Sequence, residues 1–101
     1  MLETLNLSLN QLTSFPMLDF PNLANLQIEN NSIENVDNLK LFKSEKIQIL
    51  DLSHNKIVKL APIQLQKLET LALSGNPISD WSTLSLSQLP KLKSIECYSS
   101  T

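Results

Sequence analysis

Hydrophobic and polar residues follow a frame that occurs four times along this chain. It places leucine or isoleucine at positions one, four and six, asparagine at position nine, and leucine or isoleucine at position eleven. The four copies begin at Leu2, Leu23, Ile47 and Leu68. A fifth copy begins at Leu92 but has Ser100 where the asparagine is expected. Positions four and six are separated by a single residue, which is the period of a β-strand with one buried face. The pattern therefore predicts one short strand in each copy.

The asparagine of each copy lies at the turn after the strand, where its amide can hydrogen-bond to backbone groups that a tight bend leaves unpaired. Stacked copies would place these side chains above one another as a buried ladder, each satisfying polar groups of its own coil and of the next one. A buried amide without such partners would cost about 1–3 kcal/mol, so the frame predicts that the coils stack. The predicted ladder consists of Asn10, Asn31, Asn55 and Asn76.

A further apolar position lies thirteen residues after the start of each copy, where the chain has Phe15, Val36, Leu60 and Trp81. No single copy can bury this much apolar surface alone, so we expect a solenoid and assign all four residues, Trp81 included, to its core. Successive copies start 21, 24, 21 and 24 residues apart, and the longer ones differ only after the turn. Three additional residues are about one helical turn, so we expect an extra α- or 3-10 turn on the convex side of coils two and four.

These features predict an α/β fold, a right-handed, curved solenoid with a parallel concave sheet and short 3-10 or α segments on the convex side. At 101 residues the chain is one domain or part of one. We divide it into repeats at 2–22, 23–46, 47–67 and 68–91, with a partial fifth at 92–101. Solenoids need terminal coils with a polar outer face, and neither end provides one. We therefore expect a fragment lacking both caps, with self-association through the uncapped ends as the alternative.

Charge and composition narrow the classes of partner. The formal charge is −2, and the eight lysines, with no arginine, are scattered along the sequence. A nucleic-acid surface normally has a basic stripe, so nucleic-acid binding is not expected. No segment is long and apolar enough to cross a bilayer, so we expect no membrane partner. The single cysteine, Cys97, falls at an inward strand position, where we expect an inert buried thiol. One cysteine cannot form the disulfide-bonded caps of extracellular repeat proteins, which favours the cytoplasm.

Nothing in the sequence indicates an enzyme, a cofactor or a metal site. The lone histidine, His54, has no second histidine with which to form a metal site or a catalytic dyad. Asp51 and Glu29 would share the concave face, but paired catalytic carboxylates also need a pocket and perturbed pKa values. The chain has neither a phosphate-binding glycine loop nor a serine nucleophile elbow. We therefore expect a non-enzymatic protein.

The residues predicted to point outward lie between the leucines of each strand and directly after them. Their charged members are Glu29, Asp51 and Glu96, and none is a lysine. A mildly acidic face suits a basic or polar partner, whereas a merely solvated sheet is the alternative, since polarity alone does not mark an interface. Ile49 and Tyr98 are the anchor candidates, because binding energy concentrates on apolar and aromatic residues. The predicted partner-binding residues are Asn6, Asn25, Gln27, Glu29, Ile49, Asp51, Ser53, Thr70, Glu96 and Tyr98.

The four copies of the frame resemble the leucine-rich repeat superfamily. Their length is similar to that of its short intracellular class, which includes phosphatase regulatory, spliceosomal and dynein light-chain proteins. Residues 73–82 carry an Asn-x-Ile-Ser-x-Trp-Ser turn, and residues 89–97 carry Leu-Pro-x-Leu and a strand containing a cysteine. These two stretches resemble tubulin-folding cofactor E. That resemblance implies a module that binds α-tubulin and acts as a chaperone in folding and dissociating the tubulin heterodimer. An intracellular regulatory scaffold, such as a phosphatase regulator or an axonemal adaptor, is the alternative.

Overall fold

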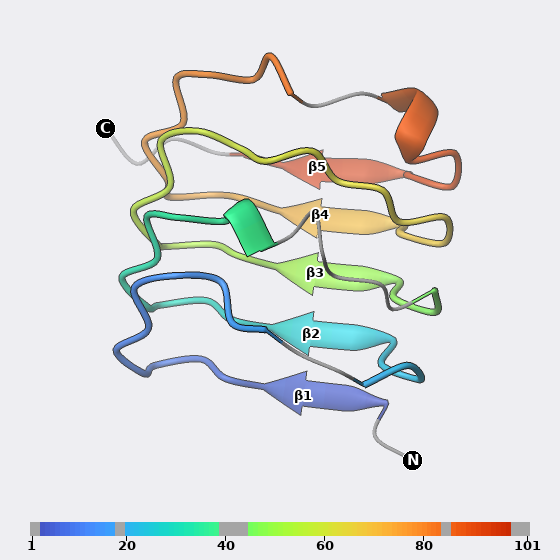
Figure 1. The fold of residues 1–101 in the computed structure, drawn as a ribbon, viewed down its shortest axis with the longest axis horizontal. Coiled ribbons are helices and arrows are strands. Elements are labelled where there is room, and N and C mark those ends of the chain that lie inside the picture. Colours follow the sequence, from blue (N-terminus) through green and yellow to red (C-terminus); the bar gives the residue numbers. More distant parts are fainter. Residues whose placement is uncertain (1–2, 18–19, 39–44, 84–85, 98–101) are drawn as a thin grey trace.

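The computed structural model describes residues 3–17, 20–38, 45–83 and 86–97. Its strands form one parallel sheet in chain order, as Figure 1 shows. The strands are β1 (Thr4–Asn6), β2 (Asn25–Gln27), β3 (Ile49–Asp51), β4 (Thr70–Ala72) and β5 (Ser94–Glu96). They pair in the register of the repeats, with Leu26 beside both Leu5 and Leu50. The predicted parallel solenoid, with one strand in each coil, is confirmed.

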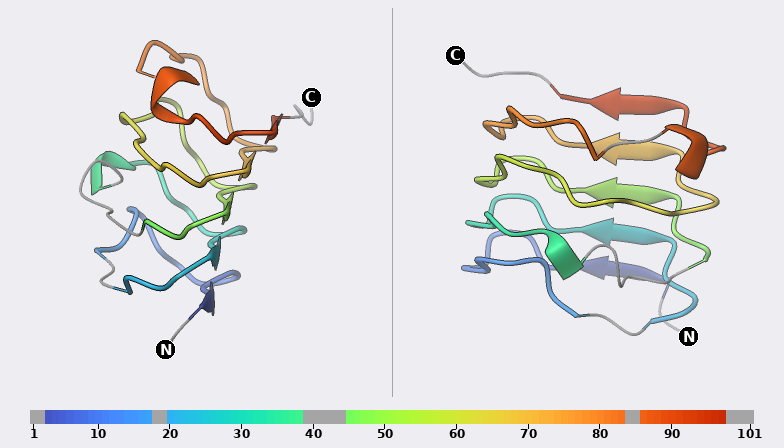
Figure 2. Two further views of the ribbon diagram at one scale, coloured as in Figure 1. Left: turned by 90° about the vertical axis from the view of Figure 1, so that its right-hand side faces the viewer. Right: turned by 45° about the horizontal axis from the view of Figure 1, so that its top comes forward.

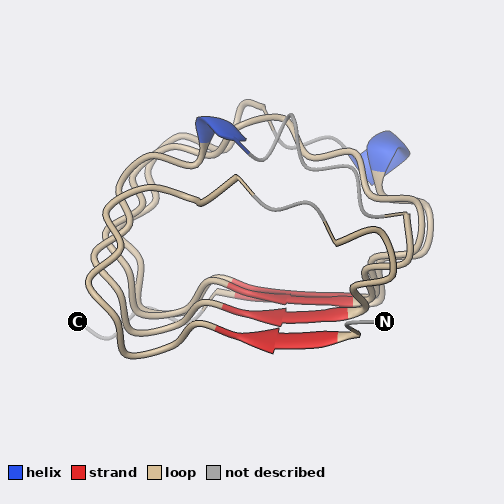
Figure 3. Cartoon of the chain, turned by 60° about the horizontal axis from the view of Figure 1, so that its bottom comes forward, coloured by secondary structure: helices blue, strands red, loops and turns tan. Residues whose placement is uncertain are grey.

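Each coil is closed by a return path that faces the sheet across the core. Figure 3 shows the strands along one side of the coils and the loops returning along the other, and Figure 2 shows the coils stacked. Single parallel bridges join the return path of neighbouring coils at Ser14 and Asn35, and at Lys59 and Asp80. The repeat therefore fixes the alignment of the coils on both sides of the core.

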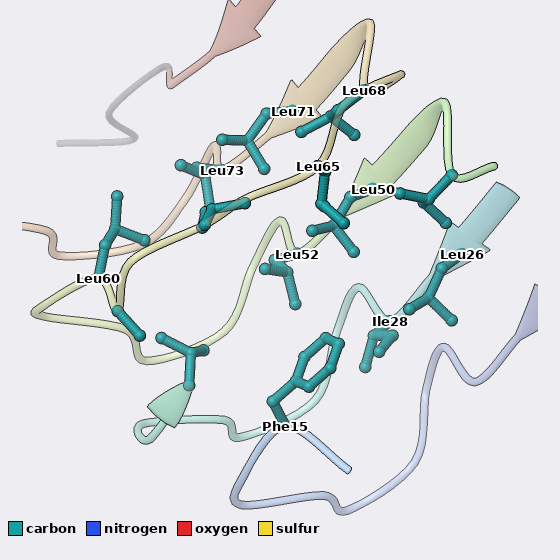
Figure 4. Packing of buried hydrophobic residues seen from close by; sticks show 14 of the residues in the cluster. Phe15, Leu26, Ile28, Leu50, Leu52, Leu60, Leu65, Leu68, Leu71 and Leu73 are labelled. Atoms are coloured by element: carbon teal, nitrogen blue, oxygen red, sulfur yellow. The ribbon is translucent and has the colours of Figure 1, made fainter. Parts of the chain in front are cut away.

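The core lies between the sheet and the return path. Leu26, Leu50 and Leu71, the central residues of β2, β3 and β4, are fully buried, and Figure 4 shows them pointing into the interior. From the opposite side, Phe15 contributes a fully buried ring. The equivalent strand residues of the first and fifth coils are only partly buried. For the central strand residues, burial therefore depends on having a neighbouring coil on both sides.

Two predictions of burial fail. Trp81 belongs to the same column as the buried Phe15 and Leu60, but it is 38% exposed. Cys97 is exposed rather than buried, although the equivalent Leu73 is in the core. Cys97 lies in the fifth coil, and the structure describes no coil beyond it. The frame therefore predicts an apolar position here but not how far it is covered.

The return path contains little helix. A 3-10 helix, η2 (Leu86–Gln88), occupies the fourth coil and confirms the extra turn predicted there. In the second coil Asp37 and Asn38 also have 3-10 geometry, while residues 39–44, which hold the remainder of the predicted turn, lie outside the described residues. The three additional residues of coil four are thus accommodated as a single tight turn.

The predicted asparagine ladder forms inside the solenoid. Asn55 is 6% exposed and donates from Nδ2 to the carbonyl oxygens of Leu52 at 2.9 Å and Ile28 at 3.1 Å. Its Oδ1 accepts a hydrogen bond from the backbone N–H of Ile33 at 3.1 Å. Asn31 and Asn76 make the equivalent bonds one coil below and one coil above. Each side chain therefore bridges its own coil to the preceding one, not to the next one as the sequence suggested.

Asn10 is the exception in this ladder. It is exposed, and its Nδ2 donates to the carbonyl oxygens of Leu7 at 2.8 Å and Ser8 at 3.2 Å, both within its own coil. The prediction that Asn10 is buried is wrong, because the structure describes no preceding coil for it to bridge. Asn10 therefore closes its turn in water rather than in the core.

A column of left-handed residues directly precedes the ladder, and the sequence analysis did not predict it. The backbone φ is +59° at Leu9, +57° at Asn30, +57° at His54 and +73° at Gly75. This conformation favours glycine and tolerates asparagine. The only glycine of the chain, Gly75, therefore lies at a position where the backbone has a left-handed φ. The ring of His54 lies against Gly75, and a Cβ there would collide with it.

Candidate protein-binding face

We define the sheet face as the outer surface of β1 to β5 together with the residue two positions after the end of each strand. Ile49 lies at its middle, in β3, and is 38% exposed. Its neighbours in register are Asn25 of β2 and Thr70 of β4. An exposed isoleucine is therefore framed by polar side chains on both flanking strands.

The predicted contact residues differ widely in how much surface they offer. Asn6, Ile49 and Glu96 are exposed. Ser53 is only 8% exposed and presents almost no surface to a partner, because it packs where the strand enters the turn. Tyr98, the predicted aromatic anchor, lies outside the described residues. The remaining predicted members are partly buried: Asn25, Gln27, Glu29, Asp51 and Thr70.

Local hydrogen bonds hold two acidic side chains of the sheet face, Glu29 and Asp51. The hydroxyl of Ser8 donates to Oε1 of Glu29 at 3.0 Å, which joins the first coil to the second. Oδ1 of Asp51 accepts from the backbone N–H of Ser53 at 3.0 Å. Asn6 makes the same bond to the N–H of Ser8 at 2.9 Å. These bonds limit side-chain motion, so the face loses less conformational entropy when it binds a rigid partner.

Strand β2, next to the central strand, also carries an unsatisfied polar atom. Oδ1 of Asn25 is buried and has no hydrogen-bond partner among the described residues. An orphaned buried acceptor costs about 1–3 kcal/mol. The unsatisfied amide oxygen of Asn25 therefore lowers the stability of the fold. Asn25 lies in register with the exposed Ile49.

A family model for the leucine rich repeat matches residues 21–78, more than half of the chain. A second leucine rich repeat model matches residues 1–23 and 67–92. The chain belongs to the leucine-rich repeat family. Neither a curated protein nor a solved structure was found to match it. Leucine-rich repeats generally mediate protein–protein interactions, and neither family match distinguishes tubulin-folding cofactor E from other repeat proteins.

Within the described part of this leucine-rich repeat chain, no three His, Cys, Asp or Glu side chains lie together in a way that could hold a metal ion. No helix in the described ranges is long and apolar enough to span a membrane.

The leucine-rich repeat register also reveals an arrangement of lysines that the sequence analysis missed. Lys46, Lys67 and Lys91 each directly precede the first residue of a repeat and are all exposed. The interpretation of the lysines as scattered is wrong for these three. Their spacings of 21 and 24 residues equal those of the repeats, and comparing lysine spacing with the leucine period would have identified them.

Proposed function

We propose that this chain is a protein-interaction module that binds its partner through the sheet face. The observation that carries this proposal is the exposed Ile49 at the centre of the sheet. Removing a partly exposed isoleucine from water is favourable by roughly 25 cal/mol for each Å² of apolar area buried. Apolar residues surrounded by polar ones are typical of the centre of an interface.

Charge supports a partner with a basic or polar contact surface. Asp51 lies two residues after Ile49 on the same strand, Glu29 follows β2, and Glu96 ends β5. The described residues of the sheet face include no lysine. A partner with basic side chains around an apolar contact would therefore be attracted and oriented by this face.

For the partner, we propose α-tubulin, with the chain acting as the repeat region of a cofactor E-like chaperone in the cytoplasm. This finer proposal rests on the resemblance of residues 73–82 and 89–97, and the single cysteine supports the reducing compartment. In the structure, Asp80 and Ser82 of this motif form a tight hydrogen-bonded turn and Trp81 is partly exposed beside it. A phosphatase-regulating or axonemal scaffold is the competing function, because short intracellular repeats occur in those proteins too.

The test measures binding of labelled chain to purified tubulin heterodimer by fluorescence anisotropy, comparing the wild type with Ile49→Asp. Val58→Asp is the matched control, because Val58 is also an exposed β-branched residue, 49% exposed, but lies outside the sheet face. We expect Ile49→Asp to weaken binding by about 10-fold or more, as loss of a central contact does, and Val58→Asp to leave it unchanged.

The possible outcomes separate the two levels of the proposal. If folded wild-type chain does not bind tubulin, the cofactor proposal is abandoned, and the same variants are tested against a phosphatase catalytic subunit and an axonemal dynein chain. If a partner binds and both variants weaken it equally, the sheet face is not the binding surface. Fluorescent tagging in cells tests the cytoplasmic location, which a secreted or membrane-enclosed signal would refute.

A further inference from the structure

A line of lysines runs along the edge of the sheet at which every strand begins. Lys46, Lys67 and Lys91 occupy the same position in three consecutive coils, and Asn22 occupies it in the coil before them. The turns that carry the lysines lie one above another beside the beginnings of β3, β4 and β5 (Figure 1). Adjacent parallel strands are about 4.8 Å apart, so the three Cα atoms follow one another at about that interval. We call Lys46, Lys67 and Lys91 the lysine ladder.

Tight turns fix the backbone beneath this ladder. The N–H of Leu68 donates to the carbonyl of Leu65, and the N–H of Leu92 donates to that of Leu89. Lys67 and Lys91 are the third residues of these turns, and Lys46 lies in the equivalent turn of its coil. The backbone of the ladder is therefore ordered by the fold, and only the lysine side chains need to be arranged when an anion binds.

Lys46, the first residue of the ladder, has a hydrogen-bond acceptor in the coil before it, whereas Lys67 and Lys91 have a lysine at that place. Nζ of Lys46 donates to Oδ1 of Asn22, the residue at the same position one coil earlier, at 2.8 Å. A lysine in one coil thus reaches the equivalent side chain of the preceding coil. One coil further on, the side chain below Lys67 is Lys46, and below Lys91 it is Lys67. An ammonium group cannot accept a hydrogen bond. Lys46 and Lys67, and likewise Lys67 and Lys91, therefore repel each other, whereas Asn22 and Lys46 form a hydrogen bond.

Nearby acidic groups leave this repulsion largely in place. Within the described ranges the only ion pair joins Nζ of Lys93 to Oε1 of Glu69 at 3.2 Å, which uses the acid nearest to Lys67 in sequence. Glu45 adjoins Lys46 and is exposed, so it can offset part of the charge at one end. Like charges directly opposite on neighbouring strands are destabilising, and an external anion would turn this repulsion into attraction.

We propose that the lysine ladder binds an acidic segment of a protein partner, with its carboxylates along one side of a helix. Glutamates at helix positions i, i+4 and i+7 rise by about 6.0 and 4.5 Å, close to the interval of about 4.8 Å along the ladder. A long polyanion such as nucleic acid fits less well, because the ladder is only three lysines long and would contact only a short part of it. The proposal stands independently of binding at the sheet face.

The experiment uses the full chain and a fluorescent 18-residue alanine-based peptide with glutamates at positions 4, 8, 11 and 15. Binding is followed by anisotropy at low and physiological salt, with a second peptide carrying glutamine at the same positions. The ladder variant is Lys67→Gln/Lys91→Gln, which leaves the contact between Lys46 and Asn22 intact. Its matched control is Lys56→Gln/Lys59→Gln, which removes the same charge from exposed lysines outside the ladder.

We expect the glutamate peptide to bind wild type and the control, and the ladder variant to bind it about 10-fold more weakly, as loss of two exposed ion pairs implies. We expect affinity to fall with added salt and the glutamine peptide not to bind. Equal loss in both double variants would mean attraction by net charge alone and would overturn the proposal. So would absence of binding to the wild type, or a preference for a single-stranded oligonucleotide of equal charge. If the ladder variant fails to fold, Lys67→Gln and Lys91→Gln are measured singly against Lys56→Gln.

Discussion

Replacing Asn55 by alanine removes a buried side chain that joins two coils, and the structure allows its effect to be worked out group by group. The carbonyl of Ile28 would keep the bond from Asn31, and the carbonyl of Leu52 would keep the bond from Asn76. The carbonyl of Ser53, which also accepts from Nδ2 of Asn55, would keep the bond from the N–H of Asn30. The N–H of Ile33, whose side chain is fully buried, would lose its partner Oδ1. One buried donor is therefore orphaned, and three acceptors keep one bond each.

An orphaned buried donor costs about 1–3 kcal/mol, and hydrogen bonds lost from groups that retain another partner cost about 1 kcal/mol or less each. We therefore expect Asn55→Ala to lower the free energy of unfolding by about 2–4 kcal/mol. For a domain of this size the midpoint of thermal unfolding should fall by about 8 °C or more. Ser53→Ala, at a neighbouring buried position, should have little effect, since no hydrogen bond of its hydroxyl is seen in the structure.

The assay is urea and thermal unfolding followed by circular dichroism, with Asn10→Ala as the matched control. Asn10 occupies the same position of the repeat, but it is exposed and bonds only within its own coil. Water can replace those bonds, so this control should lose about 1 kcal/mol or less. Equal losses in Asn55→Ala and Asn10→Ala would refute the argument that bridging buried coils is what makes the ladder stabilising.

Three further substitutions test the turns. Gly75→Ala should lower the free energy of unfolding by about 1–2 kcal/mol, because φ is +73° and a Cβ would meet the ring of His54. When His54→Ala is added to Gly75→Ala, urea titration should show recovery of only the part of this loss that is due to the collision. Leu9→Asn should raise it by up to about 1 kcal/mol, since asparagine tolerates the left-handed φ of +59° better than leucine, and an unchanged urea midpoint would show that the turn is not strained. Hydrogen bonds from the side chain and backbone of Ser82 lower the pKa of Asp80 below its ordinary value of 3.8. The stabilisation from Asp80 is therefore present above pH 3.8 and lost as the pH falls through the lowered pKa, so the melting temperatures of wild type and Asp80→Ala should differ at pH 6 and converge toward pH 2.

The architecture was predictable because one spacing rule determines it. Leucines recur at strand spacing, and asparagines follow them at a fixed distance. Only stacked parallel coils both bury the leucines and give the asparagine amides hydrogen-bond partners. Exposure was not predictable from the same rule. Trp81 and Cys97 occupy apolar positions of the frame and Asn10 occupies its asparagine position, yet all three are exposed. Burial in a solenoid depends on the neighbouring coils, which a pattern within one repeat does not describe.

The candidate binding surface was predictable only in outline. Alternation along the strands correctly placed Ile49 outward, but it also placed Ser53 there, which the turn covers. The lysine ladder could not be predicted from the number of lysines, because composition does not record where each lysine lies in the repeat. Backbone conformation was missed for a different reason, since Leu9, Asn30, His54 and Gly75 share one φ region but no side-chain chemistry.

The two proposed surfaces carry opposite charge because all strands run in the same direction. In a parallel sheet the position three residues before each strand always lies at one edge, so lysine at that position in β3, β4 and β5 becomes a line of positive charge along the solenoid. Acidic residues within or after the strands, such as Asp51 and Glu96, lie across the sheet from this line. A three-residue strand is about 10 Å long, a distance comparable with the Debye length at physiological salt. A partner that covers both surfaces must therefore carry acidic and basic groups about that far apart, and the wrong orientation would bring like charges together at both. Even weak individual contacts would then specify orientation, which is the contribution that charges at an exposed interface make best.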